Sequence, residues 1–219
     1  MKRSKWSVLW VTVGAIVVIL ITIAYVLGLS YRPAYGSSRS SNAYAETIST
    51  APNGQKHVHL NLNIVVEVGT GPHADWLGYQ TRTSPPHPGP IFNVPAGALV
   101  TVDIHNYDSR TALRNTFFTL VQGTVGGVEY VGGKKVKVMN PALTSHTFTI
   151  PQMGVTVPME GVSDTAKPTQ YEDMRFTFRA TKKKGEYRWQ CIVPCGSGLY
   201  GFGGPMQQLG YMDGWITVT

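Results

Sequence analysis

The chain has 219 residues, enough for one ordinary domain with an appendage and for a core that needs no disulfide staples. Its 24 glycines, 14 prolines and 11 tyrosines favour an all-β fold with many turns. The net charge of +7 is uneven, because residues 1–50 hold five basic side chains and one acidic one. The remainder shows no basic residues interleaved with aromatic ones along a face, so we expect no nucleic-acid partner.

The N-terminal segment predicts a membrane anchor. A basic tail at residues 1–5 precedes an uncharged run over 6–31, most of it VLWVTVGAIVVILITIAYVLGL. A bilayer-spanning helix needs about 20 apolar residues, so we predict a transmembrane helix over 6–31 with a cytoplasmic tail at 1–5. A cleaved signal peptide is the competing interpretation, but its apolar region is about 7–15 residues long. The A-x-A pattern at 43–45 also lies well past the apolar run.

The rest of the chain predicts a tether followed by one β domain. Residues 32–53 are rich in Ser, Ala and Gly and predict a flexible tether, and the domain is assigned to 54–219. Apolar and polar residues alternate over 56–66, as in a half-buried strand, and a Gly- and Pro-rich loop follows over 67–90. Further strands are predicted at 91–94, 98–105, 115–122, 128–139, 144–150, 174–180, 186–192 and 214–219. This pattern predicts a Greek-key β-sandwich.

Several residues with metal-ligand chemistry fall near strand ends of this domain. Cys191 lies at the end of one predicted strand, Cys195 lies in the loop that follows, and Met206 follows a Gly-rich stretch. His146 lies on a separate predicted strand. Thiolate, thioether and imidazole all suit copper, and ligands held by a rigid sandwich move little between Cu(I) and Cu(II). The set therefore predicts a copper site for electron transfer.

The same residues carry a resemblance to a known family. The segment EYRWQCIVPC, followed by a methionine loop and a last strand, resembles the C-terminal signature of cupredoxins, and IFNVPAGALVTVDIHNYDS is similar to an upstream cupredoxin phrase. The C-x3-C spacing resembles the dinuclear copper (CuA) loop of cytochrome c oxidase subunit II, and SHTFTIPQMGVTVP resembles that subunit's first ligand strand. The resemblance covers roughly residues 91–219. It implies a cupredoxin-like fold with the copper ligands His146, Cys191, Cys195 and Met206, and the main-chain carbonyl of Val193.

The chain departs from the CuA pattern at one ligand. The family has a histidine four residues after the second cysteine, where this chain has Leu199, and no histidine follows His146. Met206 also lies eleven residues beyond Cys195, on a longer loop. The copper count is therefore left open between one ion and a dinuclear centre, as is a site that recruits an upstream histidine.

The upstream histidines can be interpreted with or without a bound metal. His57 and His59 are two residues apart on a predicted strand and face the same side, so the pair could bind a metal. A solvated strand face is the preferred interpretation, because Asn61 and Asn63 continue that face. The others, which lie in loops or at strand ends, are His73, His87 and His105.

Together these features predict a single-pass, membrane-anchored copper protein for electron transfer, with its C-terminal domain on the extracytoplasmic side of the cell membrane. It would serve as a subunit II-like component of a terminal oxidase or as an independent carrier, with a cytochrome or oxidase subunits as redox partner. Two alternatives stay open. One is a metal-free structural or interaction module closed by a Cys191–Cys195 disulfide, because exported cysteine pairs commonly oxidise. The other is copper delivery to another protein.

Overall fold

The computed structural model describes residues 5–30, 46–69, 73–84, 86, 89–195, 204–206 and 210–219. The chain divides into two compact units, Met1–Ser41 and Asn42–Thr219, each described on its own. The first unit contains one helix, α1 (Lys5–Ser30). Its side chains are described for residues 12–24, and within the described part of the chain no helix is both long and apolar enough to cross a membrane. A helix thus forms where one was predicted, and its membrane-spanning role stays a prediction.

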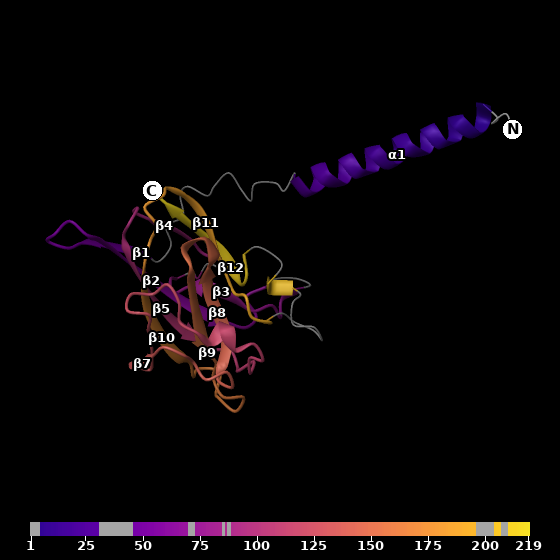
Figure 1. The fold of residues 1–219 in the computed structure, drawn as a ribbon. Coiled ribbons are helices and arrows are strands. Elements are labelled where there is room, and N and C mark those ends of the chain that lie inside the picture. Colours follow the sequence, from indigo (N-terminus) through magenta and orange to yellow (C-terminus); the bar gives the residue numbers. More distant parts are fainter. Residues whose placement is uncertain are drawn as a thin grey trace. The chain divides into compact units, whose positions relative to one another are not determined.

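The strands of the second unit form two sheets (Figure 1). The larger sheet has the order β1-β2-β5-β10-β6-β7, and β3 pairs with β2 beyond the end of β1. The pair β2–β5 is parallel, and the other pairs of this sheet are antiparallel. Its strands are β1 (Glu46–Thr50), β2 (Lys56–Val65), β3 (Gly78–Thr81), β5 (Leu99–Asn106), β6 (Glu129–Val131), β7 (Lys134–Val136) and β10 (Glu172–Arg179).

The smaller sheet has the order β4-β12-β11-β8-β9, with β12–β4 as its parallel pair. Neighbours such as β4 and β12 are far apart in the chain, so the connections cross between the sheets, as in a Greek key. The predicted β-sandwich is therefore confirmed. The strands of this sheet are β4 (Ile91–Val94), β8 (Thr144–Ile150), β9 (Val155–Glu160), β11 (Gly185–Gln190) and β12 (Asp213–Val218).

The first strand lies inside the range that the sequence assigned to a tether. Residues 46–50 form β1, which pairs antiparallel with β2, and a turn over 51–55 joins the two strands. The segment ETIST contains three β-branched residues, but five residues are too few to stand out from the Ser- and Ala-rich sequence before them. The C-terminal part of the segment predicted to be a tether, 32–53, therefore contains a strand. Its residues 32–45 lie outside the described residues.

Two predicted strands have a different structure. Residues 115–122 contain a 3-10 helix, η2 (Thr116–Thr119), because the Asn115 side chain accepts a hydrogen bond from the Phe117 N–H and caps it. Residues 128–139 contain the hairpin β6–β7 rather than one strand. Its turn is formed by Gly132 and Gly133, whose φ angles are 52° and 77°, as two-residue hairpin turns require.

Two observed strands, β3 and β9, are not among the predicted strands. The loop predicted over 67–90 contains β3, which pairs with the last residues of β2. Pro158 lies within β9. Because β9 is an edge strand of its sheet, a residue without an N–H is tolerated there.

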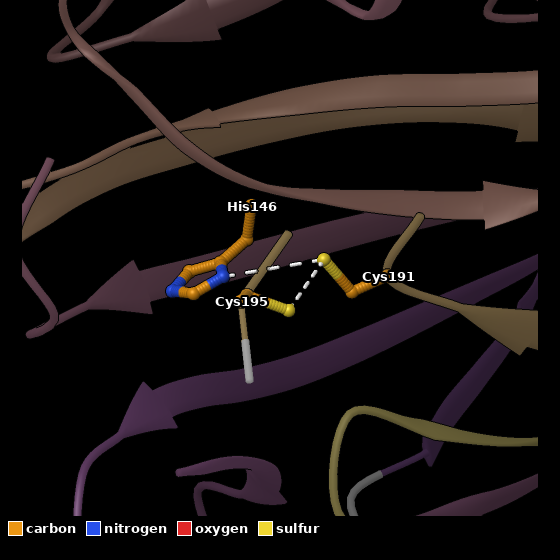
Figure 2. Close-up of side chains that lie close together, drawn as sticks. All are labelled: His146, Cys191 and Cys195. Atoms are coloured by element: carbon orange, nitrogen blue, oxygen red, sulfur yellow. Dashed lines mark hydrogen bonds between the residues drawn. The ribbon is translucent and has the colours of Figure 1, made fainter. Parts of the chain in front are cut away.

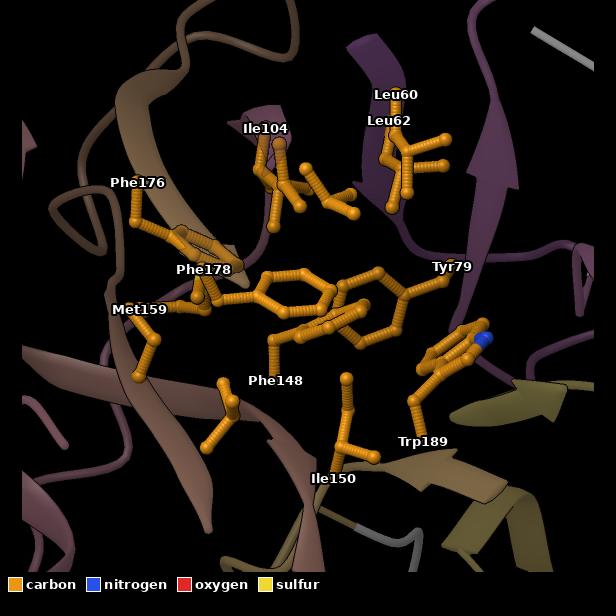
Figure 3. Packing of buried hydrophobic residues seen from close by; sticks show 14 of the residues in the cluster. Leu60, Leu62, Tyr79, Ile104, Phe148, Ile150, Met159, Phe176, Phe178 and Trp189 are labelled. Atoms are coloured by element: carbon orange, nitrogen blue, oxygen red, sulfur yellow. The ribbon is translucent and has the colours of Figure 1, made fainter. Parts of the chain in front are cut away.

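The core between the sheets is built around stacked aromatic rings (Figure 3). Trp189 of β11 stacks on Phe148 of β8 with ring centroids 5.2 Å apart, and Tyr79 of β3 meets Trp189 edge-on at 5.0 Å. Phe176 of β10 lies 5.5 Å from Phe148. Truncating a buried ring of this kind costs about 3–5 kcal/mol of stability. Since Trp189 precedes Cys191 by two residues, this packing also fixes the strand end that carries the cysteine.

The described residues contain one buried carboxyl with no hydrogen-bond partner for either oxygen, that of Glu129 on β6. Burial, and then the nearby Glu160 carboxylate, raise the pKa of Glu129 well above its usual value. Such a group stabilises the fold fully below the pKa of the unfolded chain, and this stability is lost as the pH rises through the folded pKa.

We therefore expect Glu129→Gln to raise the free energy of unfolding of the sandwich by about 1–2 kcal/mol at pH 8 and by almost nothing at pH 4. Urea unfolding of the two proteins, followed by Trp fluorescence at several pH values, measures the difference. Glu186→Gln, which removes an exposed glutamate, is the control and should show a much smaller change. A difference that is the same at pH 4 and pH 8 would contradict the prediction.

Candidate metal centre

Hydrogen bonds join strand β8 to the loop after β11 at the place where the predicted ligands lie. All seven residues of β8, including His146, are buried. Cys191 directly follows β11, and its N–H donates to the Met212 carbonyl at 2.8 Å. The N–H of Ile192 donates to Oγ1 of Thr147 at 3.0 Å. The backbone on both sides of the site is thus held in place by hydrogen bonds.

His146, Cys191 and Cys195 lie together in the interior (Figure 2). Sγ of Cys191 lies 4.0 Å from Nδ1 of His146 and 3.1 Å from Sγ of Cys195. One ligand atom from each residue falls within 4.8 Å of the others. The three residues are only 1%, 3% and 6% exposed, in that order. One imidazole and two thiols at this spacing can close around a soft or borderline metal ion.

The two cysteines are free in this structure. Their sulfur atoms lie 3.1 Å apart, whereas a disulfide bond is about 2.05 Å long. Burial raises the pKa of Cys191, but hydrogen bonds from Cys195 and His146 and the nearby His146 charge outweigh burial and bring the pKa well below its usual value. Burial and then the Cys191 thiolate raise the pKa of Cys195. Cys191 is therefore the thiolate of the pair, and Cys195 donates its S–H to it.

The ring of His146 lies between this thiolate and a carboxylate. Nε2 of His146 lies 2.9 Å from Oδ2 of Asp108, and Nδ1 faces Cys191. Burial lowers the pKa of His146, but the hydrogen bonds to Asp108 and Cys191 outweigh it and raise the pKa to about 9. The interior therefore stabilises positive charge at this point. A metal ion bound to Nδ1 and Sγ would take the place of the proton there.

A buried network holds Asp108 in position. The Asn106 side chain, at the end of β5, donates to Oγ of Ser145 and to the Glu160 carbonyl, each at 2.7 Å. Its own oxygen accepts from the N–H of Asp108 at 3.0 Å. The Asp108 carbonyl accepts from the N–H of Val162 at 3.0 Å. Asp108 is thereby tied to β8 and to the segment after β9, and its carboxylate is aimed at the ring.

The other two predicted ligands lie beside the cluster. The N–H of Cys195 donates to Sδ of Met206 at 3.2 Å, and Met206 lies on η4 (Gly204–Met206). The carbonyl oxygen of Val193 lies 3.7 Å from Sγ of Cys191. The structure thus brings all five predicted ligand residues to one place. Their ligation of a metal stays a prediction.

The upstream histidines do not lie in this cluster. His57 and His59 are on the outer face of the larger sheet, and His105 of β5 accepts a hydrogen bond at Nε2 from Arg82 at 2.8 Å. His73 stacks on Trp76, with ring centroids 3.9 Å apart. His87 and Leu199 lie outside the described residues.

Asp108 and Thr147 were missed by the sequence reasoning. Asp108 lies shortly after β5, and no local pattern couples it to a histidine 38 residues away. A threonine next to a candidate ligand on a buried strand is the only sequence signal for Thr147.

Comparisons with known proteins find similarity in fold. No protein-family model matches the chain, and no curated protein matches it. Similar solved structures include rusticyanin from Thiobacillus ferrooxidans, 18% identical over 80% of this chain and 88% of that chain with a TM-score of 0.35. Others are a multicopper oxidase (15% identity, 80% and 46% of the two chains, TM-score 0.35) and a heme-copper terminal oxidase dimer (15%, 99% and 100%, TM-score 0.33).

In this chain, sheets with the orders β2-β5-β10 and β4-β12-β11-β8 enclose a single core. The β-sandwich predicted from the sequence is thus confirmed by the strand order. Its cupredoxin-like character is what the sequence resemblance implies. Identities this low concern the fold alone, so the metal-binding role of the site depends on this chain's own side chains.

Asp108 is expected to orient His146 for metal binding. Partners that accept from the outer N–H of a ligand imidazole typically contribute 10- to 100-fold in metal affinity. We expect Asp108→Ala to weaken Zn(II) binding by about that factor, measured by competition with a chelator of known affinity. Asp108→Asn keeps an oxygen acceptor for Nε2–H and should recover most of the affinity. Equal losses in both variants would mean that the carboxylate acts by charge and not by orientation.

Proposed function

We propose that this chain is a membrane-anchored copper protein that transfers single electrons. The observation that carries the proposal is the buried cluster of one imidazole and two thiols, with a thioether beside it. Soft sulfur ligands together with imidazole select copper over hard cations such as Mg²⁺ and Ca²⁺. Nearly complete burial of the three side chains favours electron transfer over catalysis on a bound molecule.

Each residue has a separate part in holding the ion. Bound copper would supply exchange between Cu(I) and Cu(II), one electron at a time. Nδ1 of His146 and the sulfur of Cys191 bind it, and Cys195 contributes a second sulfur. The Met206 thioether is a weak additional ligand that tunes the reduction potential. The Val193 carbonyl is the main-chain candidate.

The surrounding structure keeps these ligands fixed and dry. His146 lies on a fully buried strand, and Cys191 follows a strand whose Trp189 is packed in the core. The N–H of Thr147 donates to Sγ of Cys191 at 3.4 Å, which stabilises negative charge on the sulfur. A site of this kind is preorganised and changes geometry little when the charge of the ion changes. Such rigidity is what electron transfer requires.

We propose that the centre holds one ion. Among the described residues, one imidazole lies with the two thiols, and the position at which the CuA resemblance expects a second histidine is Leu199. This donor set is sufficient for a single copper. A coupled pair bridged by both sulfurs is the alternative, and it has a different EPR hyperfine pattern.

The sequence of the N-terminal segment supports a location at the membrane. The uncharged run over 6–31 has the length and composition of a single-pass anchor, and the basic residues before it favour a cytoplasmic N-terminus. The sandwich would then lie on the extracytoplasmic side of the cell membrane. We propose a cytochrome or oxidase subunits as its redox partner, in the manner of an oxidase subunit II.

The copper proposal is tested on the full chain in detergent. The protein is reduced, given Cu(II) and freed of excess metal, and its metal content and its optical and EPR spectra are recorded. We expect one copper in the buried centre and an intense thiolate-to-copper charge-transfer band that Cys191→Ser removes. Circular dichroism of the metal-free variant checks that the sandwich is retained.

Other outcomes are equally definite. No retained copper, with no free thiol before reduction, would refute the proposal and leave a disulfide-closed module. Copper that binds without a charge-transfer band and passes quickly to a chelator would instead indicate copper delivery.

The anchor has its own test. We expect the full chain to stay in the membrane pellet after an alkaline carbonate wash, because an apolar helix of about 20 residues is inserted and not adsorbed. A chain that begins at Asn42 should appear in the supernatant of the same preparation. Release of the full chain by the wash would contradict a transmembrane anchor.

A further inference from the structure

A pair of histidines lies on the solvent side of the larger sheet. His57 and His59 alternate with the core residues Val58 and Leu60 along β2, so both imidazoles project from the outer face. Both side chains are partly exposed. Their ring centroids are 4.4 Å apart, with 32° between the ring planes. Two nitrogens from rings at this spacing can reach one ion whose bonds to nitrogen are about 2.0–2.1 Å long.

The neighbours of the pair are hydroxyl groups. Across β1, His59 is in register with Thr47 and His57 with Ser49, and both are exposed. Across β5, His59 is in register with Thr101. These positions contain no carboxylate, so the hard oxygen ligands that Ca²⁺ and Mg²⁺ prefer are missing from them.

One ring is oriented by a chain of hydroxyls. Nε2 of His57 lies 2.8 Å from Oγ1 of Thr101, which lies 2.7 Å from Oγ1 of Thr177. When Nε2–H donates to Thr101 and Thr101 donates on to Thr177, Nδ1 of His57 is left as a free acceptor. This is the arrangement by which an outer hydrogen bond fixes the tautomer of a ligand histidine. Among the described residues, the ring of His59 has no hydrogen-bond partner, so its nitrogens are also available.

We propose that His57 and His59 form a second metal site, open to solvent, for a divalent first-row transition ion such as Cu(II) or Zn(II). Two imidazoles favour these borderline ions over hard cations. Water and the nearby hydroxyls fill the remaining positions. Burial and the neighbouring His59 lower the pKa of His57, which keeps its ring in the neutral form that binds metal.

This site is separate from the buried centre. His57 is in register with Leu99 at the start of β5, and Asn106 at the end of β5 donates to Ser145, the neighbour of His146. Seven residues of strand separate these two points, about 23 Å along the sheet. An ion at the histidine pair therefore touches none of the buried ligands. The inference does not depend on what the buried centre binds.

The test adds Cu(II) alone to the full chain in detergent and counts the ions bound. We expect a copper beyond the buried one, with nitrogen hyperfine structure in EPR and without a thiolate charge-transfer band. The double variant His57→Asn with His59→Asn should lose this ion and keep the spectrum of the buried centre. Each single variant should weaken the second site at least tenfold.

His105→Asn is the matched control, because His105 also lies on the outer face but apart from the pair. It should leave the second ion in place. Unchanged stoichiometry and affinity in the double variant would refute the site. An equal loss in His105→Asn would also refute it, since that result would show diffuse binding to surface histidines. Zn(II) perturbation of the His57 and His59 ring signals in NMR gives a readout that needs no copper.

Discussion

The candidate centre depends on one residue of β8, Thr147, which joins three parts of the fold. Its N–H donates to Sγ of Cys191 at 3.4 Å, and its hydroxyl accepts from the N–H of Ile192 at 3.0 Å. Its carbonyl accepts from the hydroxyl of the buried Tyr79 at 2.9 Å. The thiolate, the cysteine loop and the aromatic core are therefore fixed to the same strand. His146 precedes Thr147 on the same strand, so its position is fixed with that of Thr147. The geometry of the ligands therefore follows from the packing of the core.

Charge compensation explains why this cluster can be buried at all. A thiolate or an imidazolium alone in a protein interior costs several kcal/mol, and pairing with hydrogen bonds offsets that cost. Here the ring of His146 is 1% exposed and lies between the Cys191 sulfur and Asp108, whose side chain is 20% exposed. The three groups form a row in which the Asp108 carboxylate is at the outer end. This carboxylate is the negative charge that water can reach. A bound cation would meet two anionic groups that are already in place, and it needs no large rearrangement.

The sequence predicted the parts of this architecture that depend on local pattern. The bounds of β4 and β8 agree with the prediction, because short runs rich in β-branched and aromatic residues between turn residues mark strands. The prediction omitted β9 and assigned a strand where Asn115 caps a 3-10 helix, since an edge position and a side-chain hydrogen bond are decided by tertiary context. The contact between Asp108 and His146 is of the same kind. Nothing in the local sequence reports which turn will face a strand 38 residues further along.

Strand periodicity also decides which histidines can serve the buried centre. Side chains along β2 and β5 alternate between the core face and the outer face of the sheet, and the core positions belong to residues such as Leu60 and Ile104. His57, His59 and His105 fall on the opposite positions. Turning any of them inward requires a slip of one residue, which would move every apolar side chain of that strand into water. The register therefore excludes these three as a second imidazole ligand, and this is the physical basis for favouring a single ion at His146, Cys191 and Cys195.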